Sequence, residues 1–154
     1  MVSKQSHYQA YSLATRTVPK TRQVVMLYDG AIRFLKQAII ALEEKRIEDR
    51  FNLLLKASKI INGLQGSIDF EKGGDVANTL FRYYTDMSIR ILSVNLKPQE
   101  SKKNCESIIE ELKQMRDVWD NIDRTLDTTG TDVPPASQPL NVPVAAEVNV
   151  TLSA

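Results

Sequence analysis

Carboxylates, one histidine and one cysteine are the side chains of this chain that could do chemistry. The pairs Glu43–Glu44 and Glu110–Glu111 would suit a di-metal centre in a helical bundle, but such a centre also needs Glu-x-x-His pairs on two helices. The only histidine is His7, near the N-terminus, and no Glu-x-x-His sequence occurs. The carboxylate pairs therefore indicate solvated helix faces, and we expect no metal and no other cofactor.

Nucleophilic catalysis has equally little support. Cys105 is the single cysteine, and no histidine accompanies it on a predicted helix to act as its base. It falls on an apolar stripe at helical spacing, which favours a buried structural thiol. The sequence EKGGD at 71–75 lacks the frame of a phosphate-binding loop and is typical of a turn. We therefore expect no catalytic residues and no enzymatic activity.

The bulk composition excludes several other classes of protein. The 154 residues include 20 Lys and Arg against 19 Asp and Glu, so no field of a single sign favours nucleic acid. Uninterrupted apolar runs stop at five residues, which is too short for direct insertion into a membrane. The N-terminal sequence lacks the apolar region of a secretory signal, and a single cysteine fits a reducing compartment. We expect a cytoplasmic protein.

Apolar residues recur at helical spacing over four long segments. Steps of three and four residues predict helices from Pro19 to about Lys45, from Ile47 to Ile68, from Asp75 to Val94 and from Pro98 to Leu126. Short connections require neighbouring helices to run antiparallel. The expected fold is all-α, an antiparallel up-down four-helix bundle over residues 19–126.

The two ends of the chain are expected to lie outside this bundle. Residues 1–18 are interpreted as an N-terminal arm. This arm is either a free end or a segment that covers part of the bundle until a partner displaces it. Residues 127–154 contain four of the six prolines and no lysine or arginine, which predicts a flexible, disordered C-terminal tail.

The predicted helices differ in how much apolar surface they carry. Residues 98–126 present one narrow apolar stripe, about what a four-helix bundle needs from each helix, whereas the three earlier helices carry more. Surplus apolar surface on a soluble protein usually marks a docking surface. The sequence therefore predicts an apolar groove that receives an apolar or amphipathic segment of another chain. The alternative is a self-associating bundle whose apolar faces meet in a homodimer, without a client.

Several motifs in order resemble the flagellin export chaperone family, FliS, over about residues 8–122. They are YQAY, VVMLYDGAIRFLKQA, LQGSIDFEKGGDVANTL and YYTDMSIRILSVN, followed by Trp119. The resemblance implies a cytoplasmic chaperone that binds the disordered C-terminal segment of flagellin and prevents premature polymerisation. It also implies delivery of that client to the flagellar type III export gate, with no cofactor.

Helix phase and the resemblance together divide the apolar residues between groove and core. Tyr8 and Tyr11 are expected to contact or gate the groove. The predicted lining of the groove is Leu27, Phe34, Ile60, Leu64, Phe81, Tyr84 and Met87. The residues predicted to lie in the core are Leu35, Leu54, Ile61, Met115 and Trp119.

Overall fold

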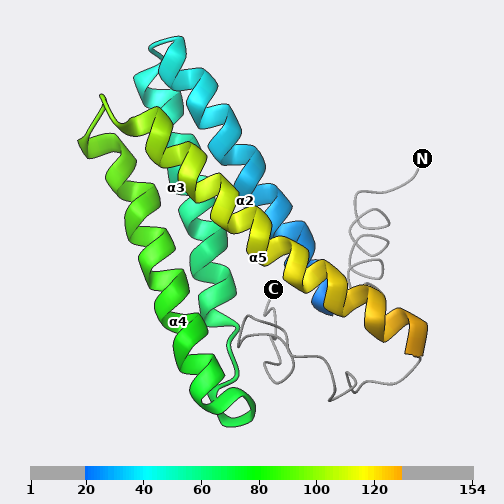
Figure 1. Cartoon of the computed structure of the whole chain (residues 1–154). Coiled ribbons are helices and arrows are strands. Elements are labelled where there is room, and N and C mark those ends of the chain that lie inside the picture. The colour runs from blue at the N-terminus through cyan, green and yellow to red at the C-terminus, as the bar shows by residue number, and fades with distance from the viewer. Residues whose placement is uncertain (1–19, 130–154) are drawn as a thin grey trace, which may run out of the picture.

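The computed structural model describes residues 20–129, which form four α-helices and one 3-10 turn (Figure 1). The elements are α2 (Lys20–Glu43), α3 (Ile47–Gly66), α4 (Phe70–Ser93), η1 (Val94–Leu96) and α5 (Ser101–Thr129). The expected all-α four-helix fold is confirmed. The predicted arm, with Tyr8 and Tyr11, lies outside the described residues. So does the predicted tail (127–154), except for its first three residues, which belong to α5. No helix within 20–129 is both long enough and apolar enough to span a membrane.

The order of packing leaves one side of the bundle open. α2 is central and packs along α3 on one side and along α5 on the other, while α3 packs along α4. α4 and α5 have few contacts with each other. Figure 1 shows that they come together near their connection through η1 and diverge away from it.

The core draws side chains from all four helices. Its largest fully buried members include Trp119, Tyr28, Leu35, Leu54 and Ile61. Burial of a side chain of this size contributes about 1.5–3 kcal/mol. The core prediction is therefore confirmed for four of its five residues, and the fifth, Met115, is only partly buried.

The start of α4 differs from the sequence prediction. The helix begins at Phe70, earlier than expected, because the Asp69 carboxylate accepts hydrogen bonds from the backbone N–H groups of Glu71 at 3.0 Å and Lys72 at 3.1 Å. The helical path then breaks at Gly74, where φ is 51° and ψ is −128°. Glycine adopts this backbone conformation without steric cost. The predicted turn is thus a first helical turn followed by a kink.

Ion pairs fasten α5 to α2 along much of its length. The pairs are Lys102–Glu43 at 2.7 Å, Arg116–Asp29 at 2.9 Å, Arg22–Asp120 at 3.0 Å and Arg22–Asp123 at 2.6 Å. Asp120 and Asp123 are buried, and the Thr21 hydroxyl also donates to Asp123. The Arg22 guanidinium and the Thr21 hydroxyl replace the water that these carboxylates lose on burial. They thereby hold this part of α5 on α2.

Candidate partner-binding surface

Large apolar side chains are exposed on three helices and on η1, but on no described residue of α5. They are Met26, Ile40, Ile47, Phe51, Phe70, Phe81, Ile89, Leu92 and Leu96. This distribution confirms that the surplus apolar surface belongs to the first three predicted helices.

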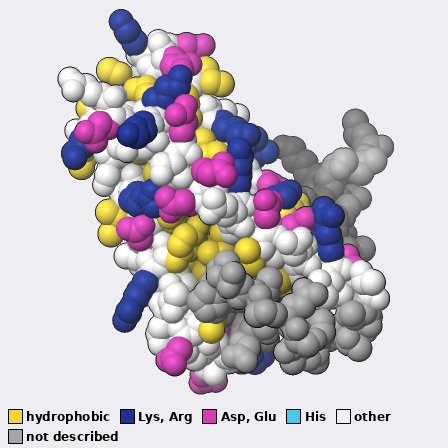
Figure 2. Space-filling model, in the orientation of Figure 1, with side chains coloured by type: hydrophobic (Ala, Val, Ile, Leu, Met, Phe, Trp, Pro, Cys, Tyr) yellow, Lys and Arg dark blue, Asp and Glu magenta, His cyan; other side chains and the backbone are white. Residues whose placement is uncertain are grey.

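A second set of apolar side chains follows the open side between α4 and α5. Val76 and Tyr83 of α4 and Met115 and Val118 of α5 pack against the core but are only partly buried. Val76, Tyr83 and Arg90 follow one another at seven-residue steps, so they lie on one face of α4. This face turns toward α5, because Arg90 bonds Glu111 of that helix. In Figure 2, apolar side chains gather between these two helices. We call Val76, Tyr83, Met115 and Val118 the α4/α5 strip.

One ion pair connects the two helices at the closed end of the α4/α5 strip. The Arg90 guanidinium donates two hydrogen bonds to the Glu111 carboxylate, both of 2.8 Å. These bonds lower the pKa of Glu111. Among residues 20–129 this is the one ion pair between α4 and α5. Past it, the helices separate (Figure 1).

Two fully buried tyrosines, Tyr28 and Tyr84, lie beneath Tyr83 of the strip. The Tyr28 hydroxyl donates to the Tyr84 hydroxyl at 3.0 Å, and the ring centroids of Tyr83 and Tyr84 are 5.5 Å apart. Burial raises the pKa of all three hydroxyls. The Tyr83 hydroxyl is also buried, and it has no hydrogen-bond partner in the described part of the chain. The strip therefore combines apolar side chains with one unused polar group.

Three of the predicted lining residues lie on a different surface, between α2 and α3. Leu27, Phe34 and Ile60 are half-buried there. The Lys56 ammonium lies 5.6 Å from the centroid of the Phe34 ring. A Cβ atom added at Gly30 would lie 3.3 Å from the Ile60 Cδ1 atom, so the two helices pack closely at this point. We call Leu27, Phe34 and Ile60 the α2/α3 strip.

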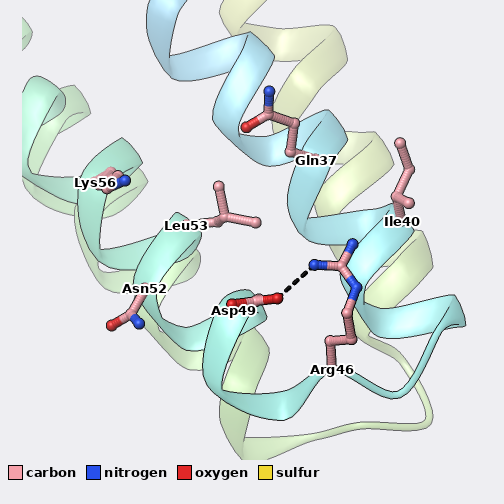
Figure 3. Close-up of a pocket in the computed structure, with 7 residues that line it drawn as sticks. All are labelled: Gln37, Ile40, Arg46, Asp49, Asn52, Leu53 and Lys56. Carbon is pink, nitrogen blue, oxygen red and sulfur yellow. Dashed lines mark hydrogen bonds and ion pairs between the residues drawn. The ribbon is translucent and has the colours of Figure 1, made fainter.

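An open pocket of about 400 Å³ lies on the same α2/α3 side (Figure 3). Its lining is Gln37, Ile40, Arg46, Asp49, Asn52, Leu53 and Lys56. α4 and α5 lie behind α2 and α3 in this view, so the pocket faces away from the α4/α5 strip. No group of three His, Cys, Asp or Glu side chains within 20–129 is arranged to hold a metal ion.

The other predicted lining residues do not share one surface. Leu64, Tyr84 and Met87 lie in the core and are at most 1% exposed, because their sides of α3 and α4 face the neighbouring helices. A partner cannot touch them in this conformation, which corrects the prediction of a single lining. Phe81 is 42% exposed, and its ring centroid lies 5.7 Å from that of Phe70.

Comparisons with known proteins agree on one family. A family model described as flagellar protein FliS matches residues 3–126. The flagellar secretion chaperone FliS of Campylobacter jejuni is 32% identical over 114 residues, which cover 73% of this chain and 87% of the relative. FliSB of Pseudomonas aeruginosa is 33% identical over 101 residues, covering 66% and 79%. FliS of Salmonella typhimurium is 40% identical over 75 residues, covering 48% and 56%. With its four-helix architecture, the chain belongs to the FliS family.

Proposed function

We propose that this protein is a cytoplasmic export chaperone for flagellin. It binds the disordered C-terminal segment of flagellin, prevents premature polymerisation and helps to deliver the client to the flagellar type III export gate. The relatives' name, flagellar secretion chaperone, supports the export role. Membership of a chaperone family also confirms the expectation that the chain is not an enzyme.

The observation that carries the proposal is the α4/α5 strip. Two diverging helices leave Val76, Tyr83, Met115 and Val118 partly accessible above a buried aromatic base. An apolar or amphipathic segment can cover these side chains and gain about 25 cal/mol for each Å² of apolar surface removed from water. We therefore place the principal contact of the client on this strip.

A client of this kind must contact more than one surface. A segment that folds on binding loses roughly 2–5 kcal/mol in ordering and typically buries on the order of 1,000–3,000 Å². Four partly buried side chains offer less area than that. We propose that the client extends to Phe70 and Phe81 at the start of α4 and to the α2/α3 strip. Tyr8 and Tyr11 are further proposed contacts.

Two matched charge insertions test the principal contact. Val118 belongs to the α4/α5 strip, and Leu53 is a half-buried residue of the pocket on the opposite side. We expect Val118→Asp to weaken binding of a labelled flagellin C-terminal segment at least about tenfold, because an apolar contact would then bury a charge. Leu53→Asp lies next to the secondary contact on the α2/α3 side and should weaken binding by no more than about two- to fivefold. Fluorescence anisotropy measures the affinity, and circular dichroism confirms that both variants are folded.

A third variant tests the extension of the client. Phe34→Ser in the α2/α3 strip is expected to weaken binding about two- to fivefold. If Phe34→Ser abolishes binding while a folded Val118→Asp variant binds normally, the principal contact lies between α2 and α3. Normal binding by both folded variants would contradict both placements.

The exposed apolar side chains also suit the alternative, a self-associating bundle. Light scattering of the full chain with and without the flagellin segment separates the two functions. A chaperone is expected to form a complex of defined mass with the segment. A stable homodimer whose mass the segment leaves unchanged would support the alternative.

A further inference from the structure

Residues 142–152 carry an alternating pattern in a part of the chain that the family model does not match. The model ends at residue 126. Apolar residues occupy every second position of the segment, at Val142, Val144, Ala146, Val148, Val150 and Leu152. In an extended chain, alternate side chains lie on the same side. An extended segment over 142–152 would therefore present one continuous apolar edge.

The spacing of this edge fits α5. Alternate residues of an extended chain are about 6.6 Å apart, and four residues of an α-helix rise about 6 Å. Met115, Val118 and Ile122 follow one another along α5 at steps of three and four residues. Apolar side chains at alternate positions of an extended segment can therefore contact successive apolar side chains of the helix.

The chain is long enough to bring this segment back to the α4/α5 strip. Val148 lies 19 residues after Thr129, the last residue of α5. At about 3.3 Å per residue, such a connection reaches up to about 60 Å, whereas the helix from Met115 to Thr129 is about 21 Å long. The entropic cost of closing a loop also grows only slowly with its length.

The segment can cover the strip with little loss of charge hydration. Residues 130–154 contain no lysine or arginine and only two acids, Asp132 and Glu147. In an extended segment, Glu147 would lie on the edge opposite Val148 and Val150. A backbone carbonyl of an extended segment could also accept from the buried Tyr83 hydroxyl, which lacks a partner among the described residues.

We propose that residues 142–152 dock in extended form on the α4/α5 strip of the same chain and compete there with the client. The competition rests on the proposed function, which places the client on this strip, whereas the docking does not. A docked tail lowers the apparent affinity for the client, because only the fraction of chains whose strip is free can bind. Client binding would release the tail, and the tail would cover the strip between clients.

Two full-length variants with the same added charge test the competition. The apolar-edge variant carries Val148→Asp, Val150→Asp and Leu152→Asp. The polar-edge variant carries Asn149→Asp, Thr151→Asp and Ser153→Asp. We expect the apolar-edge variant to bind the flagellin C-terminal segment about three- to tenfold more tightly than the parent chain, because its strip is free. The polar-edge variant should match the parent, and equal affinities for all three chains would overturn the competition.

A spin label tests the docking without any client. Burial raises the pKa of the Cys105 thiol to about 11, so a cysteine introduced by Ala154→Cys is labelled selectively. We expect the label to broaden the methyl NMR signals of Met115 and Val118 but not those of Leu53 on the α2/α3 side. The broadening should disappear when the apolar-edge substitutions are added. If the labelled chain that keeps its apolar edge shows no broadening, the docking is overturned.

A mixture of labelled and unlabelled copies identifies the source of the broadening. Broadening that occurs only between copies would show that the strip binds the tail of a second copy, which overturns docking within one chain. Docking without client binding by any variant would reject the proposed function and the competition. Client binding without docking would reject only the inference about the tail.

Discussion

The hydroxyl groups of Tyr28 and Tyr84 lie 3.0 Å apart and join α2 to α4 across the core. Both side chains are fully buried, so neither hydroxyl can turn to water if the other is lost. A buried polar group without a partner costs about 1–3 kcal/mol, whereas removal of both partners can be nearly neutral. This pair is therefore a polar contact whose two members stabilise the fold only together.

We predict that Tyr28→Phe lowers the free energy of unfolding by about 1–3 kcal/mol, because it leaves the Tyr84 hydroxyl unpaired. The double variant Tyr28→Phe/Tyr84→Phe should be less destabilised than the sum of the two single variants. Urea unfolding followed by circular dichroism gives all four corners of this double-mutant cycle. Additive effects would show that the two hydroxyls are energetically independent.

The Arg22 guanidinium pairs with two buried carboxylates, Asp120 and Asp123. We predict that Arg22→Ala lowers the free energy of unfolding by about 1–3 kcal/mol, because it leaves Asp123 without a cation and Asp120 with only the exposed Arg124, at 2.9 Å. The partial exposure of Arg22 and the remaining contact with Thr21 keep the loss below that of a fully buried pair.

Arg46 provides the control for this prediction. It pairs with Glu44 and Asp49, and all three side chains are exposed. Arg46→Ala should therefore change stability little. If both substitutions shift the midpoint of urea unfolding equally, the buried carboxylates are not what makes Arg22 important.

Two glycines offer a matched test of backbone conformation. Gly74 has φ of 51° and ψ of −128°, whereas Gly63 lies inside α3 at a place where an added Cβ atom would meet no group of a neighbouring element within 4 Å. We predict that Gly74→Ala destabilises the protein by about 1–3 kcal/mol, since side chains strain this conformation. Gly63→Ala should stabilise it by about 0.5–1 kcal/mol, because alanine favours the helix. Chemical unfolding measures both changes, and a stabilising Gly74→Ala would contradict the kink.

Alkaline pH is expected to destabilise the fold. Burial raises the pKa of Tyr28, Tyr83 and Tyr84 above their ordinary value of 10.0, and that of Cys105 to about 11. The unfolded chain therefore releases these protons first as pH rises. Their contribution to stability is complete below about pH 8 and is lost as pH rises through 9 and 10 toward the folded-state values.

The slope of the free energy of unfolding against pH identifies the groups responsible for this loss. Each group adds up to about 1.4 kcal/mol of lost stability per pH unit between its unfolded and folded pKa values. Cys105→Ala should make the decline between pH 9 and 11 shallower. Urea unfolding at pH 7, 9 and 10.5 measures the effect, and a stability that stays constant over this range would contradict it.

The sequence was sufficient to predict the helices because their apolar spacing is long and regular. The predicted segment 47–68 corresponds to the observed Ile47–Gly66, and 19–45 to Lys20–Glu43. The start of α4 was less predictable because two aspartates, Asp69 and Asp75, could each cap a helix. Asp69 supplies the observed cap, which depends on local backbone geometry that the apolar pattern does not report.

The division between surface and core was harder to predict for a physical reason. Helix phase tells which side of a helix is apolar but not which neighbouring helix covers that side. Tyr84 and Met87 therefore lie in the core, whereas Met115 lies on the α4/α5 strip. The seven-residue spacing of Val76, Tyr83 and Arg90 was a usable signal, but it required knowing that Arg90 meets Glu111 on α5.

The single ion pair between α4 and α5 has a consequence for experiments in different buffers. Arg90 and Glu111 are both partly exposed, so dissolved ions weaken their attraction, whereas the carboxylates buried against α2 are shielded from those ions. Salt also weakens the exposed pairs Lys102–Glu43 and Arg116–Asp29, but α2 and α5 remain joined by core packing, whereas α4 and α5 have few other contacts. Ionic strength is therefore expected to loosen the contact between α4 and α5 first. Binding of the proposed flagellin segment to the α4/α5 strip should respond to added sodium chloride at concentrations that leave the melting temperature unchanged.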